Sequence, residues 1–195
     1  MSTTYIVYIV IAVIVLWAIA AYNNFVKLVH RTKEAWADID VQLKRRYDLI
    51  PNLVEAVKGY AGHERATFDA VTEARAKATQ IHIDPSNMTA ESVKAMMGAE
   101  AGLGQALGKL LAVAEAYPDL KANANFAQLQ MELSDTENKI QAARRFYNGN
   151  VQDLNTAVQS FPSNVIAGMF GFKQMDLFQL TDSESAAREP VQVSF

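Results

Sequence analysis

Apolar residues fill the beginning of the chain without interruption. The stretch Tyr5–Tyr22 contains no charged side chain. As a helix it would be about 27 Å long, which is close to the thickness of the hydrocarbon core of a bilayer. Aromatic residues, which favour the membrane–water interface, lie toward both of its ends. The pattern predicts a membrane-crossing anchor over residues 1–22.

A cleaved signal peptide is the alternative interpretation, because Ala18–Ala20 has the small-x-small form of a cleavage site. A signal peptide, however, normally begins with basic residues and has a shorter apolar core. Here the cations follow the apolar stretch, at Lys27, Arg31 and Lys33. Positive flanks remain on the cytoplasmic side. We therefore expect an uncleaved, single-pass anchor in the cell membrane, with its amino terminus outside and the body of the protein in the cytoplasm.

Beyond the anchor, apolar positions recur at alternating intervals of four and three residues, the a/d pattern of a helix packed in a bundle. The first seam comprises Phe25, Val29, Thr32, Trp36, Ile39, Leu43 and Arg46. No helix-breaking residue separates Tyr22 from Phe25. The membrane helix is therefore predicted to continue into this segment as a single rod.

A corner between two helices is predicted where three cations precede a proline. Lys44–Arg46 would form the last turn of the first helix, where cations suit the negative end of the helix dipole. Asp48 would cap the next helix, and Pro51 is tolerated in a first turn. Arg46, Asp48 and Pro51 thus define the predicted corner. Phosphate binding by the triplet is the alternative, for which a basic triplet alone is weak support.

Three further helices follow from the same period. The second is predicted from about Pro51 to Gln80, the third begins after a cap at Thr89, and the fourth ends before Pro162. Short connections make neighbouring helices antiparallel. The sequence therefore predicts an all-α fold, an elongated up-down-up-down four-helix bundle over residues 23–161.

Two segments follow the predicted bundle. The apolar segment 162–180 is rich in Phe and Met, and we expect residues 165–178 to lie in the lipid headgroup region or against the anchor. The alternative is a flap folded onto the side of the bundle. The final segment, 181–195, is polar and is predicted to be disordered.

Composition supports this picture. Half of the residues are hydrophobic, and the chain has nine Gly and five Pro, a mixture that favours helix. The net charge of −3 and the anchor argue against a nucleic-acid partner. The absence of cysteine excludes disulfides and thiol nucleophiles.

Three seam positions hold glutamate: Glu64, Glu100 and Glu137. Antiparallel stacking of the predicted helices places all three at one depth, and buried carboxylates need compensation. The first interpretation is a charge network that fixes helix register with a nearby arginine, of which Arg144 is a candidate together with Arg31 and Arg145. In the second, the glutamates lie at helix edges in water.

The third interpretation is a metal site in a layer of carboxylates. Di-metal bundles use a Glu-x-x-His motif on two helices, and none of His30, His63 and His82 has a glutamate three residues before it. We therefore predict no metal and no cofactor.

Three long motifs resemble the LemA family. They are AYNNFVKLVHRTKEAWADIDVQLKRRYDLIPNLVEAVKGYAGHE at Ala21–Glu64, YPDLKANANFAQLQMELSDTENKIQAARRFYN at Tyr117–Asn148, and the ending from Pro162 to Phe172. The resemblance covers about Tyr5 to Phe178. It implies a bacterial membrane protein with one amino-terminal span and a cytoplasmic helical bundle. It implies no known enzymatic activity.

The function expected from these observations is that of a non-catalytic membrane scaffold that self-associates or binds an unidentified protein. No nucleophile–base signature, phosphate loop or metal-ligand spacing is present. The alternative is a metal-binding bundle or an enzyme. Four glycines on the third helix, Gly98, Gly102, Gly104 and Gly108, indicate close approach of another helix, either within the bundle or in an oligomer.

Overall fold

The computed structural model describes residues 3–85 and 88–178. Within these residues there are helices and no strands, which confirms the predicted all-α fold. The helices are α1 (Thr3–Lys58), α2 (Arg65–Gln80), α3 (Ala90–Glu115), α4 (Pro118–Lys121), α5 (Ala124–Gln159) and α6 (Ser163–Phe170). The predicted disordered tail, 181–195, lies outside the described residues.

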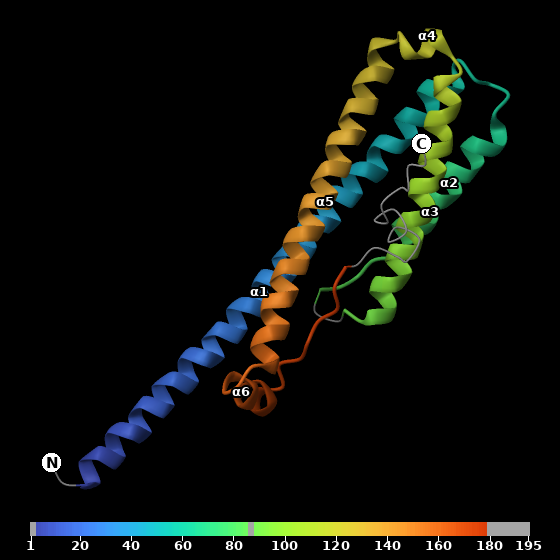
Figure 1. Cartoon of the computed structure of the whole chain (residues 1–195). Coiled ribbons are helices and arrows are strands. Elements are labelled where there is room, and N and C mark those ends of the chain that lie inside the picture. Colours follow the sequence, from blue (N-terminus) through green and yellow to red (C-terminus); the bar gives the residue numbers. More distant parts are fainter. Residues whose placement is uncertain (1–2, 86–87, 179–195) are drawn as a thin grey trace, which may run out of the picture.

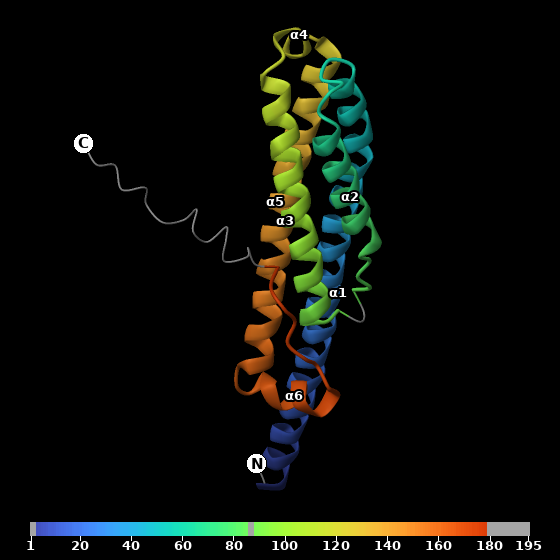
Figure 2. The same cartoon turned by 90° about the vertical axis from the view of Figure 1, so that its right-hand side faces the viewer.

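Helices α1, α2, α3 and α5 lie side by side with alternating directions, and α1 extends far beyond the others (Figures 1 and 2). Helix α1 packs mainly against α5, while α2 packs mainly against α3. The short helix α4 joins α3 to α5 at the end farthest from the amino terminus, and α6 lies against α1 near the foot of the bundle. The molecule is therefore a long rod, α1, with a helical body along its distal part.

The apolar beginning of α1 is uncovered. Its most apolar window of 18 residues has a mean hydropathy of 2.6, and none of it is buried within the chain. This stretch is long and apolar enough to cross a membrane. It continues into the bundle without a break, as predicted, because no residue between Tyr22 and Phe25 interrupts the helix.

The corner predicted at Arg46, Asp48 and Pro51 is wrong. Helix α1 passes through all three residues, with Pro51 inside it, and ends only at Lys58. The reason is the apolar stripe, which continues in phase: Ile50, Val54 and Val57 are buried like the seam residues before them. The true turn is the segment 59–64, and α2 begins at Arg65.

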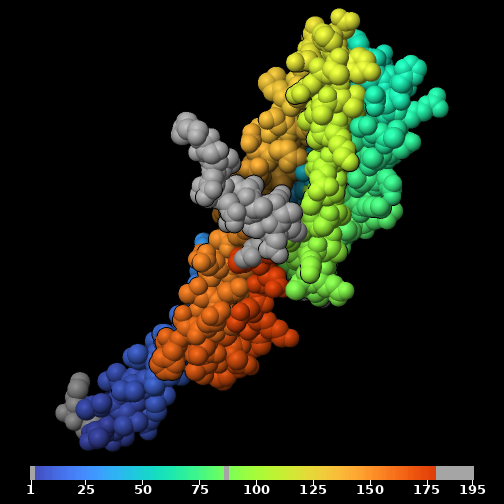
Figure 3. Space-filling model, turned by 45° about the vertical axis from the view of Figure 1, so that its right-hand side comes forward, coloured from blue at the N-terminus to red at the C-terminus, as the bar shows by residue number. Residues whose placement is uncertain are grey.

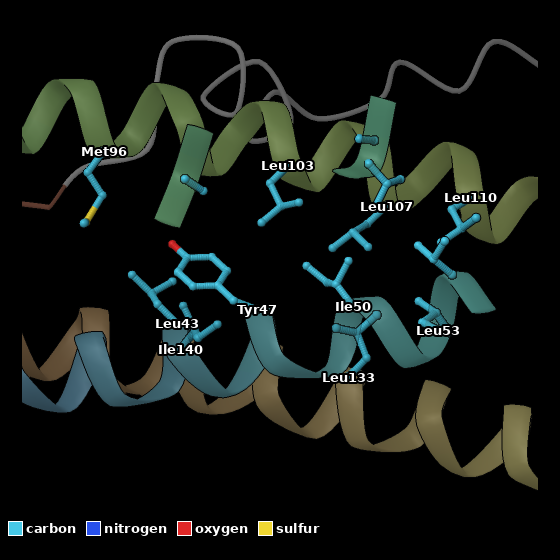
Figure 4. Close-up of a cluster of buried hydrophobic side chains, with 14 of the residues drawn as sticks. Leu43, Tyr47, Ile50, Leu53, Met96, Leu103, Leu107, Leu110, Leu133 and Ile140 are labelled. Atoms are coloured by element: carbon cyan, nitrogen blue, oxygen red, sulfur yellow. The ribbon is translucent and has the colours of Figure 1, made fainter. Parts of the chain in front are cut away.

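The main hydrophobic core of the bundle lies between α1, α2, α3 and α5 and is mostly aliphatic. Figure 4 shows Leu43, Ile50 and Leu53 of α1 pointing toward leucines of α3, with side chains of α5 behind them. Six of the seven predicted seam residues of the first helix are buried: Phe25, Thr32, Trp36, Ile39, Leu43 and Arg46. The a/d period thus identified the buried face of α1 correctly.

Capping residues fix where the later helices begin. The Thr89 side chain accepts a hydrogen bond from the backbone N–H of Ser92, and the Ser92 hydroxyl lies 3.1 Å from the backbone nitrogen of Thr89 as its reciprocal partner. This capping box starts α3 at the residue predicted. Asn123 caps α5 by accepting hydrogen bonds from the backbone N–H groups of Asn125 and Phe126.

The glycines of α3 do not serve close packing within the body of the protein. Apart from its two chain neighbours and the nearby backbone of α3 itself, a Cβ atom placed at Gly98, Gly102, Gly104 or Gly108 would meet no atom of the described residues within 4 Å. Packing inside the bundle is therefore not the reason for these four residues, contrary to one of the two explanations given above. The other, a contact between protein molecules, stays a prediction.

After α6 the chain turns back and runs along α5 as an extended strap, residues 172–178. Asn155 and Asn148, two turns apart on α5, each bind one strap residue through both atoms of the side-chain amide. The Asn155 side chain donates to the carbonyl oxygen of Met175 (2.8 Å) and accepts from its N–H (2.9 Å). Asn148 makes the same pair of bonds with Phe178, at 2.9 and 2.7 Å. The strap is thus part of the folded body.

Candidate functional site

A buried arginine on α1 lies at the centre of the polar part of the core. Arg46 is only 5 % exposed. Its Nη1 donates to Oε1 of Glu137 on α5 at 2.7 Å, and its Nη2 forms an ion pair with Glu100 on α3. One guanidinium therefore links three helices. We call Arg46, Glu100, Glu137 and the adjacent Tyr47 the arginine layer.

Tyr47 completes the partners of the more buried glutamate. Its hydroxyl donates to Glu100 of α3, and Figure 4 shows the Tyr47 ring reaching from α1 toward α3 between Met96 and Leu103. Burial raises the pKa of Tyr47 to about 12, against a lowering effect of Arg46. The hydroxyl therefore stays protonated, and so remains a hydrogen-bond donor, throughout the physiological range.

A second arginine supports the layer from α2. In a regular helix the carbonyl of Tyr47 would accept a bond from the N–H of residue 51, but Pro51 has no N–H. Nε of Arg75 donates to this carbonyl at 2.7 Å. The helix therefore continues through the proline with its freed acceptor satisfied by a neighbouring helix.

The charges of the arginine layer indicate a structural role. Glu100 and Glu137 would repel each other without a cation, and desolvated carboxylates are costly unless paired. The positive charge of Arg46 offsets both the repulsion between the carboxylates and their desolvation cost, and the carboxylates neutralise Arg46. Nε of Arg46 and Oε1 of Gln42, one turn away, are buried and have no protein partner among the described residues. Because the charged groups of the layer are paired with one another across three helices, we infer that the layer fixes the register of α1, α3 and α5 rather than offering a reactive group.

The structure brings together two of the four residues predicted for a polar layer. Glu100 and Glu137 share Arg46, whereas Glu64 is exposed at the start of α2 because the helix corner lies farther along the chain than predicted. Arg144 lies instead above the ring of Phe178 in the strap, 4.5 Å from its centroid. The cation of the layer is thus Arg46.

Sequence reasoning missed the roles of Tyr47 and Arg75 and misplaced that of Arg46. A signal for Arg46 was present, because it occupies an a/d position of the first seam, as Glu100 and Glu137 do in theirs. One positive and two negative side chains at seam positions of neighbouring helices indicate an ion pair between them. The false corner at Pro51 hid this, since it assigned Arg46 to the last turn of a helix, where a cation already suits the helix dipole.

No metal centre is evident in the described part of the chain. Among residues 3–85 and 88–178, no three His, Asp or Glu side chains are grouped so that they could hold a metal ion. An open groove of about 490 Å³ runs along α5 and the strap and is lined by Arg145, Asn148, Gly149, Gln152, Asn155, Thr156, Gln159 and Leu177. These amide and hydroxyl groups contain no acid–base pair suited to catalysis.

Fold and site together define a class: helical-bundle proteins whose first core helix extends into a stretch able to cross a membrane. Comparison with known proteins specifies the family. The sequence pattern of the LemA family matches residues 35–195. The chain belongs to the LemA family.

Individual relatives are distant in sequence. The chain is 27 % identical over 175 residues to Magnetosome protein MamQ 2 of Paramagnetospirillum magneticum, a match that covers 81 % of this chain and 64 % of that protein. It is 26 % identical over 174 residues to Magnetosome protein MamQ of Magnetospirillum gryphiswaldense, covering 80 % and 64 %. It is 25 % identical over 162 residues to Protein LemA of Metamycoplasma hominis, covering 83 % and 70 %. The chain thus spans less than two thirds of the MamQ proteins.

Proposed function

We propose that this LemA-family membrane protein is a non-catalytic, single-pass scaffold that holds a rigid helical body close to a bilayer. The carrying observation is the continuity of α1, in which one 56-residue helix provides both the uncovered apolar stretch and the central element of the core. A hinge between anchor and body is what a freely moving domain would need, and α1 has none between Tyr22 and Phe25.

The arginine layer supports a structural rather than a catalytic role. Its charged groups are directed at one another across α1, α3 and α5, and catalysis requires groups that can reach a substrate. Such a layer keeps the body in a single register. A rigid body presents its outer faces to other proteins in a fixed orientation relative to the membrane, which suits self-assembly or capture of a protein partner.

The proposed orientation places the amino terminus outside and the body in the cytoplasm. It rests on Lys27 and Arg31, which are exposed on the body side of the apolar stretch. The cysteine-free chain allows a direct test. Thr3→Cys should react with a membrane-impermeant maleimide on intact cells, whereas Lys109→Cys on α3 should react only after lysis. Labelling of Lys109→Cys on intact cells would refute this orientation.

The scaffold proposal is tested by photo-cross-linking in native membranes. A benzophenone maleimide is attached to Lys109→Cys on α3 or to Met131→Cys on α5, both at exposed positions. A ladder of self-products supports assembly, and one foreign product supports an adaptor. Absence of any product from both faces would contradict the scaffold, and stoichiometric iron, manganese or zinc in the purified protein would contradict its metal-free character.

A further inference from the structure

Large apolar side chains are uncovered at the foot of the bundle, in and just before α6. Phe161 is 83 % exposed, Val165 51 %, Met169 73 % and Phe170 57 %. We call these four residues the foot patch. The surrounding sequence, residues 154–172, contains no charged side chain. Several large exposed apolar side chains within ten residues indicate a candidate interaction site.

The orientation of α6 is fixed by its opposite face. Ile166 and Ala167 are buried against Phe25 of α1 and Leu154 of α5. Phe172, at the end of the segment, stacks on Phe25 with ring centroids 4.9 Å apart. Helix α6 is therefore held firmly on α1 and α5 by this face, and the side chains of the foot patch remain exposed beside them.

The foot patch lies at the depth where the apolar stretch of α1 ends. Tyr22 is the last residue of that stretch, and its ring contacts the ring of Phe170 edge to face at 4.8 Å. The remainder of the stretch, residues 5–21, extends about 26 Å beyond this contact, which is close to one hydrocarbon thickness. Figure 3 shows the amino-terminal part of α1 leaving the body beside the orange and red segment that contains α6.

Cations lie on the body side of the same level. Lys27 and Arg31 are exposed on α1 within about three turns of Tyr22, and Lys173 is exposed directly after the foot patch region. An apolar surface bordered by cations on its aqueous side is the pattern of an element that lies in the headgroup region of an anionic bilayer.

We propose that the foot patch is a second membrane contact. It inserts into the headgroup region of the leaflet on the side where α1 leaves the membrane and enters the body of the protein. The occupant is lipid because the patch continues the surface of the apolar stretch at the level where that stretch meets water. Residues 175–178 do not insert, since Asn155 and Asn148 hold Met175 and Phe178 on α5. The inference rests on the membrane anchoring proposed above.

The test uses the full-length protein in vesicles with either neutral or partly anionic headgroups. An environment-sensitive fluorophore is placed at Met169→Cys, and its quenching by lipids that carry a nitroxide near the headgroup is measured. Met131→Cys is the matched control, because Met131 is a methionine of similar exposure, 66 %, at the distal end of α5. Leu16→Cys, within the apolar stretch, reports on anchoring itself.

Three outcomes are informative. Strong quenching at positions 16 and 169 with little at 131, and a larger effect in anionic vesicles, is expected. Quenching at 16 but not at 169 overturns the inference and leaves the anchor standing, whereas no quenching at either position refutes the anchor. Efficient disulfide formation between two Met169→Cys chains without lipid quenching assigns the foot patch to a second copy of the protein and also overturns the inference.

Discussion

Nε of Arg75 lies 2.7 Å from the carbonyl oxygen of Tyr47, the acceptor that Pro51 leaves without its helical donor. Proline inside a helix costs about 3 kcal/mol or more, part of which is the lost bond. Arg75 on α2 thus supplies the hydrogen-bond donor that Pro51 cannot provide within α1. This hydrogen bond therefore couples the two helices at the position of the proline.

This coupling predicts a non-additive pair of substitutions. Arg75→Leu should lower the free energy of unfolding by about 1–3 kcal/mol, because a partly buried carbonyl loses its partner. In a Pro51→Ala background the new N–H can bond to Tyr47, so the same substitution should cost less. Urea denaturation of the four proteins in detergent measures the difference, with the exposed Lys77→Leu as control. Equal costs in both backgrounds would refute the coupling.

Arg46 should be among the most sensitive positions in the protein. Arg46→Met leaves Glu100 and Glu137 facing each other without a cation, and breaking a buried ion pair in this way costs about 3–5 kcal/mol. The neighbouring Arg45→Met, at an exposed position, should change stability by no more than about 0.5 kcal/mol. Thermal denaturation of the two variants side by side makes the comparison. Similar small losses in both would show that the layer contributes little.

Replacing the whole layer by apolar residues should behave differently. Arg46→Met combined with Glu100→Leu and Glu137→Leu removes the desolvation cost together with the pair, and such replacements are often neutral or stabilising. We expect the triple variant to recover most of the stability lost in Arg46→Met. Failure to recover would mean that the layer, and not the charge imbalance alone, is required for packing.

Alkaline pH should weaken the fold through Tyr47. Its pKa is about 12 in the folded protein and 10.0 as the reference value, so the folded state favours the protonated hydroxyl. The corresponding stability is complete below about pH 10 and is lost as the pH rises toward 12. Tyr47→Phe should therefore lose less stability across this window, as followed by denaturation at several pH values. An unchanged pH dependence would exclude a contribution from Tyr47.

The glycines of α3 offer a stabilising change. Gly104→Ala and Gly108→Ala should each raise the free energy of unfolding by about 0.5–1 kcal/mol, because alanine favours helix and its Cβ meets open space among the described residues. Gly171→Ala is the opposite case, since Gly171 has φ of +73° and alanine would be strained there. Reduced self-cross-linking in the stabilised α3 variants would assign these glycines to an interface between copies.

The strap should come loose when its two asparagines are removed. Each amide forms two hydrogen bonds with the strap backbone, so Asn148→Ala together with Asn155→Ala removes four. Trypsin should then cleave after Lys173 faster than in the parent protein. Asn138→Ala, an exposed position on the same helix, is the control. Unchanged cleavage would show that ring packing of Phe172 and Phe178 suffices.

The sequence predicts the fold correctly where burial of one face of a helix determines the structure. The a/d period identified Phe25, Trp36 and Leu43 as core residues, and the cap at Thr89 predicted where α3 begins. Pro51 misled because proline signals a helix start only when nothing else completes the bonds it removes. The donor that completes them, Arg75, is 28 residues away, and no local pattern reveals such a partner.

The candidate site was predictable only in part for the same reason. Glu100 and Glu137 were recognisable as charges at seam positions. Their partner depended on the depth at which α1 is placed against α3 and α5, and the misplaced corner shifted that depth. The pairs that Asn148 and Asn155 form with the strap had no sequence signal, since side-chain amides on exposed helix faces are common.

An unbroken α1 acts as a lever. If residues 5–22 cross the bilayer, the rod continues from Tyr22 to Lys58 for about 54 Å, and a change in tilt of about 10° would move its far tip sideways by about 9 Å. Apolar segments tilt in response to bilayer thickness. Local thinning or thickening of the lipid would thus be converted into lateral travel of the distal end, far from the surface where the change occurs.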